Sequence, residues 1–230
     1  MKTIGLMGGM SWESSVEYYR IINEEVKNRL GGLHSAKCLL YSVDFAEIER
    51  FQAGGEWEKA GKLLGDVAHS LEKGGADLII ICTNTMHRVI DYVEEKIRIP
   101  ILHIADTTAK QIKKSNLNTV GLLGTKYTME QDFYKSRIES KGIKVLVPNG
   151  AEREMVNKVI YEELCLGNIQ QSSRDYYKMV IKNLVDNGAE GIILGCTEIG
   201  LLVKQEDSEV PLFDTTVIHA IEAVNAALEH

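Results

Sequence analysis

The chain has 230 residues, carries 26 Lys and Arg against 33 Asp and Glu, and has a formal net charge of −7. Hydrophobic residues make up 44% of it, which is enough for a packed core and argues against disorder. The acidic excess argues against nucleic-acid binding, which needs clustered positive charge. No apolar run reaches the roughly 20 residues that cross a bilayer, and the segment from Met1 to Met10 lacks the pattern of a secretory signal. These features predict a cytoplasmic protein with no membrane partner.

The four cysteines are too sparse for a disulfide scaffold, and no CxxC pair or Cys/His cluster has zinc spacing. A reduced compartment and no bound metal are therefore expected. Cys38 and Cys165 are predicted to be packing residues, whereas Cys82 and Cys196 lie where apolar runs meet polar loops. Residues 228–230 are interpreted as the remnant of an expression tag.

Along the chain, short apolar runs alternate with amphipathic helices. Residues 60–71 place apolar side chains at i, i+3, i+4, i+7, i+8 and i+11, and residues 177–185 repeat this spacing. Gly74 and Gly188 lie where a glycine ends a helix. The apolar runs predict buried strands at 3–7, 38–43, 78–81, 101–103, 120–123, 145–147, 192–194 and 212–213. This alternation predicts an α/β fold of parallel sheets covered by helices on both faces.

Three pairs of segments indicate that one α/β unit occurs twice. GADLIIICTNT from residue 75 matches GAEGIILGCTE from residue 188, at an offset of 113. IGLMGG from residue 4 resembles VGLLGT from residue 120, and IPILHIADTT from residue 99 resembles VPLFDTT from residue 210. Glycine-alanine turns before buried strands are common in α/β proteins, but three matches at similar offsets favour duplication over coincidence.

The repeat predicts two pseudo-symmetric lobes, each a mainly parallel sheet flanked by helices. We expect the first lobe at 1–104, rejoined by a C-terminal helix at 215–227, and the second at 105–214. The seam should fall between Ile104 and Asn118, where the pattern of apolar residues breaks. Because ligands of open α/β sheets bind beyond the carboxyl ends of the strands, the active site is expected in a cleft between the lobes.

Aligning the two copies of the repeat identifies equivalent residues. At the offset of 113, Thr83 corresponds to Cys196, and Cys82 corresponds to Gly195. Neighbouring residues of a strand point to opposite faces, so Cys82 is not expected to point where Cys196 points. Thr83 and Cys196 are the predicted pair that faces the cleft.

The first turn, GLMGGMSWESS, is rich in glycine and lies between a strand and a helix. It lacks the GxGxxG and Walker patterns, so a dinucleotide site is disfavoured. Backbone N–H groups at a helix N-terminus bind anions, and the turn is predicted to accept a small carboxylate, lined by Met10 and Ser11. The alternative is a tight turn that uses the conformational freedom of glycine.

Cys196 lies just after a predicted strand and before a predicted helix. Most free cysteines are small core residues, but a thiol at a helix N-terminus has a lowered pKa and is more reactive. Asn84, Thr85 and Thr197 add short hydrogen-bonding side chains at both strand ends, suited to the α-carboxylate of an amino acid.

Other polar residues carry weaker signals. His87, His103 and His219 lie isolated near element ends and are interpreted as structural histidines rather than catalytic ones. Gln52 is placed in a polar loop that reaches the cleft.

The motifs MGGMSWES, CTNTMH, LLGTKYTMEQDFY and GCTEIGLL resemble those of the cofactor-independent aspartate/glutamate racemases, in the broad-specificity amino-acid branch, over essentially the whole chain. The resemblance implies two pseudo-symmetric lobes, a homodimer, an amino-acid substrate and catalysis without pyridoxal phosphate or metal. It also implies one cysteine at each of two equivalent strand ends, one removing the α-proton and the other delivering a proton to the opposite face.

Carried over to this sequence, the second cysteine is Cys196, and Thr83 stands where the first is expected. The resemblance implies that the substrate site is lined by Met10, Gln52, Asn84, Thr85, Thr125, Thr197 and Glu198. Arg50 and Lys126 are candidates for binding the distal carboxylate. A threonine hydroxyl is a far weaker acid than a thiol, which predicts slow proton delivery from Thr83. Two alternatives stay open: a single-cysteine decarboxylase of the same superfamily, and a binding protein without turnover.

Overall fold

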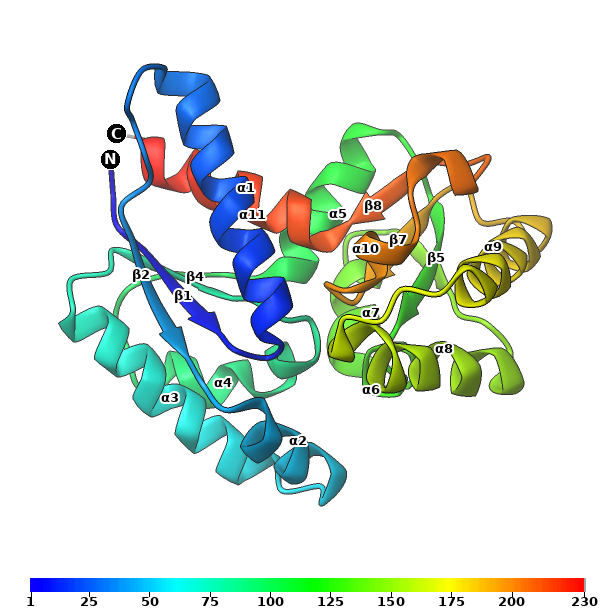
Figure 1. The fold of residues 1–230 in the computed structure, drawn as a ribbon, viewed down its shortest axis with the longest axis horizontal. Coiled ribbons are helices and arrows are strands. Elements are labelled where there is room, and N and C mark those ends of the chain that lie inside the picture. Colours follow the sequence, from blue (N-terminus) through cyan, green and yellow to red (C-terminus); the bar gives the residue numbers. More distant parts are fainter. Residues whose placement is uncertain (230) are drawn as a thin grey trace. The chain divides into compact units, whose positions relative to one another are not determined.

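The eight predicted strands all occur in the part of the chain that the computed structural model describes, residues 1–229, and each bound lies within one residue of its prediction. His230, the last residue of the predicted tag remnant, lies outside the described residues. The chain forms two compact units (Figure 1). One comprises Met1–Ile104 and the chain from His219 onward, and the other comprises Ala105–Ile218.

The first unit is built on a parallel sheet with the strand order β2–β1–β3–β4. Its elements are β1 (Ile4–Gly8), α1 (Trp12–Leu30), β2 (Cys38–Ser42), α2 (Phe45–Ala53), α3 (Trp57–Lys73), β3 (Leu78–Ile81), the 3-10 helix η1 (Thr85–Val89), α4 (Ile90–Glu94), β4 (Ile101–Leu102) and α11 (Thr215–Leu228), whose first residues belong to the second unit.

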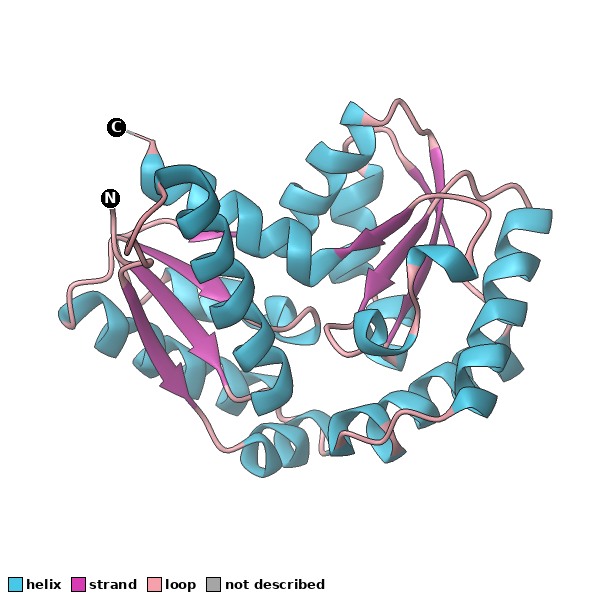
Figure 2. Ribbon diagram, turned by 45° about the horizontal axis from the view of Figure 1, so that its top comes forward, coloured by secondary structure: helices cyan, strands magenta, loops and turns pink. Residues whose placement is uncertain are grey.

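The second unit has the equivalent parallel order, β6–β5–β7–β8. In each unit, helices surround the strands of the sheet (Figure 2). The elements of the second unit are α5 (Ile104–Lys114), β5 (Thr119–Gly124), α6 (Lys126–Glu130), α7 (Asp132–Glu139), β6 (Lys144–Leu146), α8 (Gly150–Glu162), η2 (Leu164–Leu166), α9 (Gln171–Asp186), β7 (Ile192–Gly195), α10 (Ile199–Leu202), η3 (Gln205–Asp207) and β8 (Leu212–Asp214).

Alternate residues of the first sheet pack into two separate apolar cores, one on each face. Leu6 and Ile80 pack with α1 and α11 in one core, and Met7 and Ile81 pack with α3 in the other. The predicted apolar stripe of α3 supplies the second core. Burial on both faces explains why these strands are continuous apolar runs rather than alternating ones. No helix within residues 1–229 is long and apolar enough to cross a membrane.

Equivalent hydrogen bonds occur in both units, with donor residues that are 113 positions apart. The amide of Ile79 donates to Pro100 O and that of Ile192 to Pro211 O, both at 2.9 Å. Two further pairs of bonds lie just before the two strands. The amide of Gly75 donates to Glu72 O as that of Gly188 donates to Val185 O, and the amide of Asp77 donates to Thr3 O as that of Glu190 donates to Thr119 O. The hydrogen bonds therefore align β3 with β7 residue by residue, with the same offset as the sequence repeat.

Matched glycines make the turns before these two strands. Gly75 has a φ of 97° and Gly188 a φ of 98°, in the left-handed region that favours glycine. Gly74 directly follows Lys73 and is the C-cap of α3, as predicted, with a φ of −71°. In the second unit Asn187 is the C-cap of α9, and Gly188 is the residue after it.

Candidate active site

Cys82 follows β3 and packs into the core between α1 and α11. Its side chain is fully buried, in the same cluster as Leu6, Tyr18 and Ala223. Its amide donates to Met7 O at 3.0 Å, which continues the pairing with β1. Burial raises the pKa of the Cys82 thiol well above its ordinary value, so this thiol stays protonated and unreactive.

Thr83 is the next residue and is partly exposed. Its carbonyl oxygen accepts a hydrogen bond from His87 Nδ1 at 2.8 Å. Asn84 and Thr85 follow, both at least 95% buried, and Thr85 begins η1. The register of the two units puts Thr83 at the place in the first unit that Cys196 holds in the second.

The glycine-rich turn after β1 is closed by its own serines. Ser15 Oγ accepts the amide proton of Gly9 at 2.7 Å and donates to Ser11 O at 2.8 Å. Ser11 caps α1 by accepting from the amide of Ser14 at 3.3 Å. These side chains already satisfy the amides of Gly9 and Ser14, so those two groups do not bind an anion in this arrangement.

Gly9 is required in this turn by space and by conformation. It has a φ of 89°, and a Cβ there would lie 2.3 Å from Val43 O. Replacement by any other residue would therefore push the turn away from the end of β2. The tight turn therefore depends on the conformational freedom of glycine.

Met10 and Gln52 lie on the other side of the first sheet. Met10 is 3% exposed and packs in the core that α3 covers, together with Ile48 and Met86. Gln52 belongs to the last turn of α2, so its placement in a loop is wrong. Its side chain is 4% exposed, and Nε2 donates to Met86 Sδ at 2.9 Å.

Cys196 comes directly after β7 in the second unit and is bonded to its neighbours. Its thiol donates to Glu198 Oε2 at 2.9 Å, and Thr197 Oγ1 donates to the same oxygen at 2.8 Å. Cys196 is 8% exposed, Thr197 6% and Glu198 2%. Three of the predicted residues therefore form one buried hydrogen-bonded group.

The predicted lowering of the pKa of Cys196 is wrong for this arrangement. Burial and the neighbouring Glu198 carboxylate raise the pKa of the Cys196 thiol well above its ordinary value, and Cys165 adds to the effect. The helix after Cys196 is the four-residue α10, which begins three residues later at Ile199 and offers little opposing dipole. No pattern in the sequence indicates that Cys165 lies near this thiol.

A pair of glycines sets the space beside Cys196. Gly124 and Gly195 are register partners at the ends of β5 and β7. A Cβ on Gly195 would lie 2.8 Å from Leu123 O, and one on Gly124 would lie 2.9 Å from Gly195 O. The ends of β5 and β7 therefore lie against each other, and Thr125 and Cys196 are the residues that follow them. The Thr125 hydroxyl caps α6 by accepting from the amide of Thr128 at 3.3 Å, and Thr125 is 5% exposed.

The two candidate cations for a distal carboxylate already have acidic neighbours on their own units. Arg50 Nη2 lies 3.8 Å from Glu47 Oε1, and Lys126 Nζ lies 3.0 Å from Glu154 Oε1. Both pairs are on exposed surface, where such interactions are weak.

The three histidines interpreted as isolated form a buried cluster in the first unit. The rings of His87 and His103 are 4.4 Å apart between centroids, and those of His87 and His219 are 5.9 Å apart. All three are at least 96% buried. His87 and His219 are hydrogen-bonded to backbone atoms of the first unit. The interpretation of the three histidines as isolated is wrong, because residues distant in sequence meet at the ends of β3 and β4.

The repeated strand order and the matched strand ends define an α/β protein of two equivalent halves. The family model of the Asp/Glu/hydantoin racemases matches residues 7–223. The chain therefore belongs to the Asp/Glu/hydantoin racemase family.

Similar proteins agree with this membership. The broad-specificity amino-acid racemase RacX of Bacillus subtilis is 26% identical over 169 residues, which are 74% of this chain and 73% of that protein. The crystal structure of a candidate Asp/Glu racemase from Yersinia pestis is 57% identical and covers both chains completely, with a TM-score of 0.93. The structure of PH1733, an aspartate racemase homologue from Pyrococcus horikoshii, is 38% identical with a TM-score of 0.86 and equal coverage. Family membership supports amino-acid racemase activity, which is an isomerisation.

Proposed function

We propose that this protein interconverts L- and D-aspartate or glutamate without a cofactor, with Cys196 and Thr83 acting on opposite faces of the substrate Cα. The observation that carries the proposal is the shared hydrogen-bond register at an offset of 113, which makes the two residues equivalent. Relatives named as amino-acid and glutamate racemases support the substrate class.

Cys196 removes the α-proton of the L-substrate in this proposal. A thiol must lose its own proton first, because the thiolate is the base. Glu198 Oε2, 2.9 Å from the Cys196 sulfur, is placed to take that proton. The Thr197 hydroxyl donates to the same carboxylate oxygen. The buried group thus holds a thiol and its proton acceptor in contact.

Thr83 delivers a proton to the opposite face, fed by water. The hydroxyl is a far weaker proton donor than a thiol, so this step limits inversion. Because the two enantiomers of a single-centre amino acid have equal free energy, kcat/KM is equal in the two directions. A slow Thr83 step therefore slows both directions of inversion while leaving Cys196 able to exchange the α-hydrogen of the L-substrate.

The remaining predicted residues bind the substrate in this proposal. Asn84, Thr85 and Thr197 offer short donors for the α-carboxylate. The other contributions come from the turn at Met10 and Ser11, from Gln52, from Thr125 and from Glu198. Because these residues come from both halves of the chain, the proposal requires both strand ends to reach one substrate.

The test follows hydrogen exchange and inversion together. L-Glutamate and L-aspartate are incubated in deuterated buffer while mass spectrometry reports α-deuterium and optical rotation reports inversion. We expect exchange to be faster than inversion, and Thr83→Cys to raise inversion by restoring two-thiol chemistry. Equal rates in the wild type, or no gain in a folded Thr83→Cys variant, contradict the role of Thr83. Carbon dioxide release points to a decarboxylase, and tight binding without exchange points to a binding protein.

We also propose a homodimer in the cytoplasm. Exposed apolar residues recur on α1 at i, i+4 and i+7, where Trp12, Val16 and Tyr19 are 65%, 52% and 53% exposed. Such a stripe suits burial against another surface. The cysteines of the described chain are all free, which suits a reducing compartment. Analytical ultracentrifugation tests the dimer, and Val16→Glu should dissociate it if α1 forms the interface.

A further inference from the structure

His87 joins the Thr83 strand end to the point where the chain leaves the first unit. Its Nδ1 lies 2.8 Å from Thr83 O, and its Nε2 lies 3.3 Å from the amide nitrogen of Ile104. A carbonyl oxygen accepts and an amide donates, so Nδ1 carries the proton and Nε2 is the acceptor. His87 is therefore neutral, and each ring nitrogen has its own backbone partner.

His219 makes a matching bridge from α11. Its Nε2 donates to Leu102 O at 2.8 Å, which fixes the proton on Nε2, and its Nδ1 accepts from Tyr18 Oη at 2.8 Å. Leu102 and Ile104 are the two neighbours of His103, so the two histidines hold the peptide groups on both sides of it. The end of β4 is thereby fixed against β3, α1 and α11.

The surroundings keep His87 and His219 neutral. Burial and the neighbouring imidazoles of His103 and His219 hold the pKa of His87 well below its ordinary value. Burial lowers the pKa of His219 to about 4. Protonation of His87 would point an N–H at the amide of Ile104 and leave two donors facing each other.

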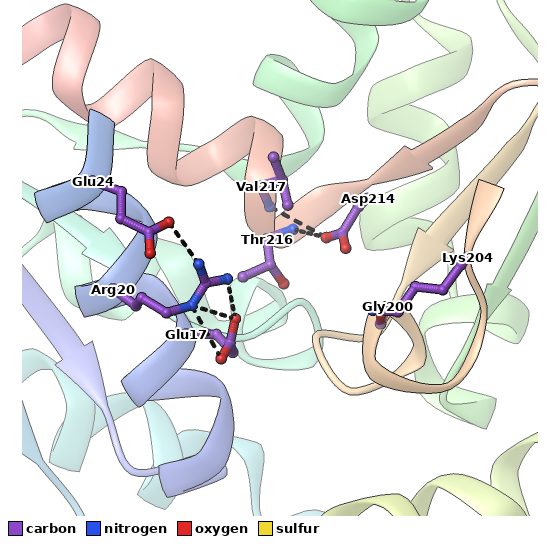
Figure 3. Close-up of polar contacts among 8 residues, drawn as sticks. All are labelled: Glu17, Arg20, Glu24, Gly200, Lys204, Asp214, Thr216 and Val217. Atoms are coloured by element: carbon purple, nitrogen blue, oxygen red, sulfur yellow. Dashed lines mark hydrogen bonds and ion pairs between the residues drawn. The ribbon is translucent and has the colours of Figure 1, made fainter. Parts of the chain in front are cut away.

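The second unit does not use this device. At the offset of 113, Gly200 corresponds to His87, and a Cβ on Gly200 would lie 2.2 Å from Asp214 Oδ2. Asp214 corresponds to His103 in the repeat and caps α11 through the amides of Thr216 and Val217, at 2.9 and 3.2 Å (Figure 3). The fold of an equivalent strand end thus forms without a histidine, which separates the role of His87 from the general needs of the fold.

We propose that His87 is a positioning residue for Thr83, holding the Thr83 peptide through the Nδ1–H bond so that the hydroxyl is set for the second face of the substrate. This inference rests on the proposed function, since it gives His87 a role in the Thr83 step alone. Thr83 is the weaker acid of the pair, so its step has the least tolerance for displacement. A displacement of about 1 Å costs roughly 100-fold in rate.

Two substitutions separate the two ring nitrogens. Asparagine places its amide N–H near the position of Nδ1, so His87→Asn keeps a donor for Thr83 O. Glutamine places its oxygen near the position of Nε2, so His87→Gln keeps an acceptor for the Ile104 amide and loses the bond to Thr83. Both variants lose the imidazole ring, which makes each the control for the other.

The measurement is the ratio of α-hydrogen exchange to inversion for the L-substrate in deuterated buffer, with thermal unfolding as the check on folding. We expect His87→Gln to raise this ratio roughly 10- to 100-fold by slowing inversion while exchange through Cys196 continues. His87→Asn should keep the ratio within about threefold of the wild type. If His87→Gln does not fold, the ratio in His87→Asn decides alone.

An unchanged ratio in folded His87→Gln overturns the inference, because a purely structural role would slow exchange and inversion together. An equal rise of the ratio in His87→Asn also overturns it, because that variant keeps the donor for Thr83 O. A wild type without any exchange or inversion overturns the proposed function itself, and that outcome is visible before any variant is made.

Discussion

The contact between the Cys196 thiol and the Glu198 carboxylate makes a quantitative prediction. Glu198→Gln removes a negative charge 2.9 Å from the sulfur. Coulomb's law gives about 1.4 kcal/mol for this interaction at the dielectric constant of water and about 6 kcal/mol at an effective dielectric constant of ~20. One pKa unit corresponds to about 1.4 kcal/mol, so the pKa of Cys196 should fall by roughly 1 to 4 units.

The assay is alkylation of Cys196 by iodoacetamide as a function of pH, with the modified peptide identified by mass spectrometry. The midpoint of the rate profile reports the pKa of the thiol, since the thiolate is the reactive form. Glu163→Gln is the matched control. It removes the same charge within the same unit, where Glu163 Oε2 accepts from Ser173 Oγ at 2.6 Å, and should leave the midpoint in place.

In Glu198→Gln the exchange activity should fall although the Cys196 thiol becomes more acidic. Glu198→Gln makes the thiol easier to ionise but removes the group that accepts its proton, so exchange of the L-substrate should slow by roughly 100-fold or more. A midpoint that stays or rises in Glu198→Gln refutes the electrostatic reasoning. A lower midpoint with undiminished exchange refutes the role of Glu198 as proton acceptor and leaves the charge effect intact.

Further predictions concern the core, the turns and the histidine cluster. His219 has a folded pKa of about 4 against an ordinary 6.5, so the unfolded chain binds more protons between these values. Stability should therefore fall by about 3 kcal/mol as pH drops through this window, and urea unfolding of His219→Gln should show a shallower fall. Cys82→Ala should cost roughly 1 kcal/mol yet keep exchange and inversion, whereas Cys196→Ala should abolish both; a folded, inactive Cys82 variant would contradict the packing role. Gly75→Ala should cost about 1 to 2 kcal/mol in thermal unfolding because of its φ of 97°, while Gly150→Ala, at the first residue of α8, should be neutral or stabilising.

The strands, their bounds to within one residue and the equivalence of the two halves could all be predicted from apolar patterning and the internal repeat. Apolar periodicity is a local property, and burial of the strands on both faces leaves an unbroken apolar run that is legible without coordinates. The equivalent positions of Thr83 and Cys196 could be predicted in the same way. A repeat preserves the register of its strands, and a slip of one residue would turn every side chain to the other face. Local patterning misplaced Gln52, which lies in the last turn of α2 rather than in a loop.

The electrostatics of the candidate site could not be predicted from the sequence, because they depend on burial and on contacts between side chains. The position of Cys196 between a strand and a helix predicts a lowered pKa for its thiol. The pKa depends instead on burial and on the position of the Glu198 carboxylate, and residue spacing indicates neither. The histidine cluster is likewise invisible in sequence, since His87 and His219 are separated by more than half the chain. Their contact exists because parallel strands bring their carboxyl ends to one edge, where α11 returns to the same sheet.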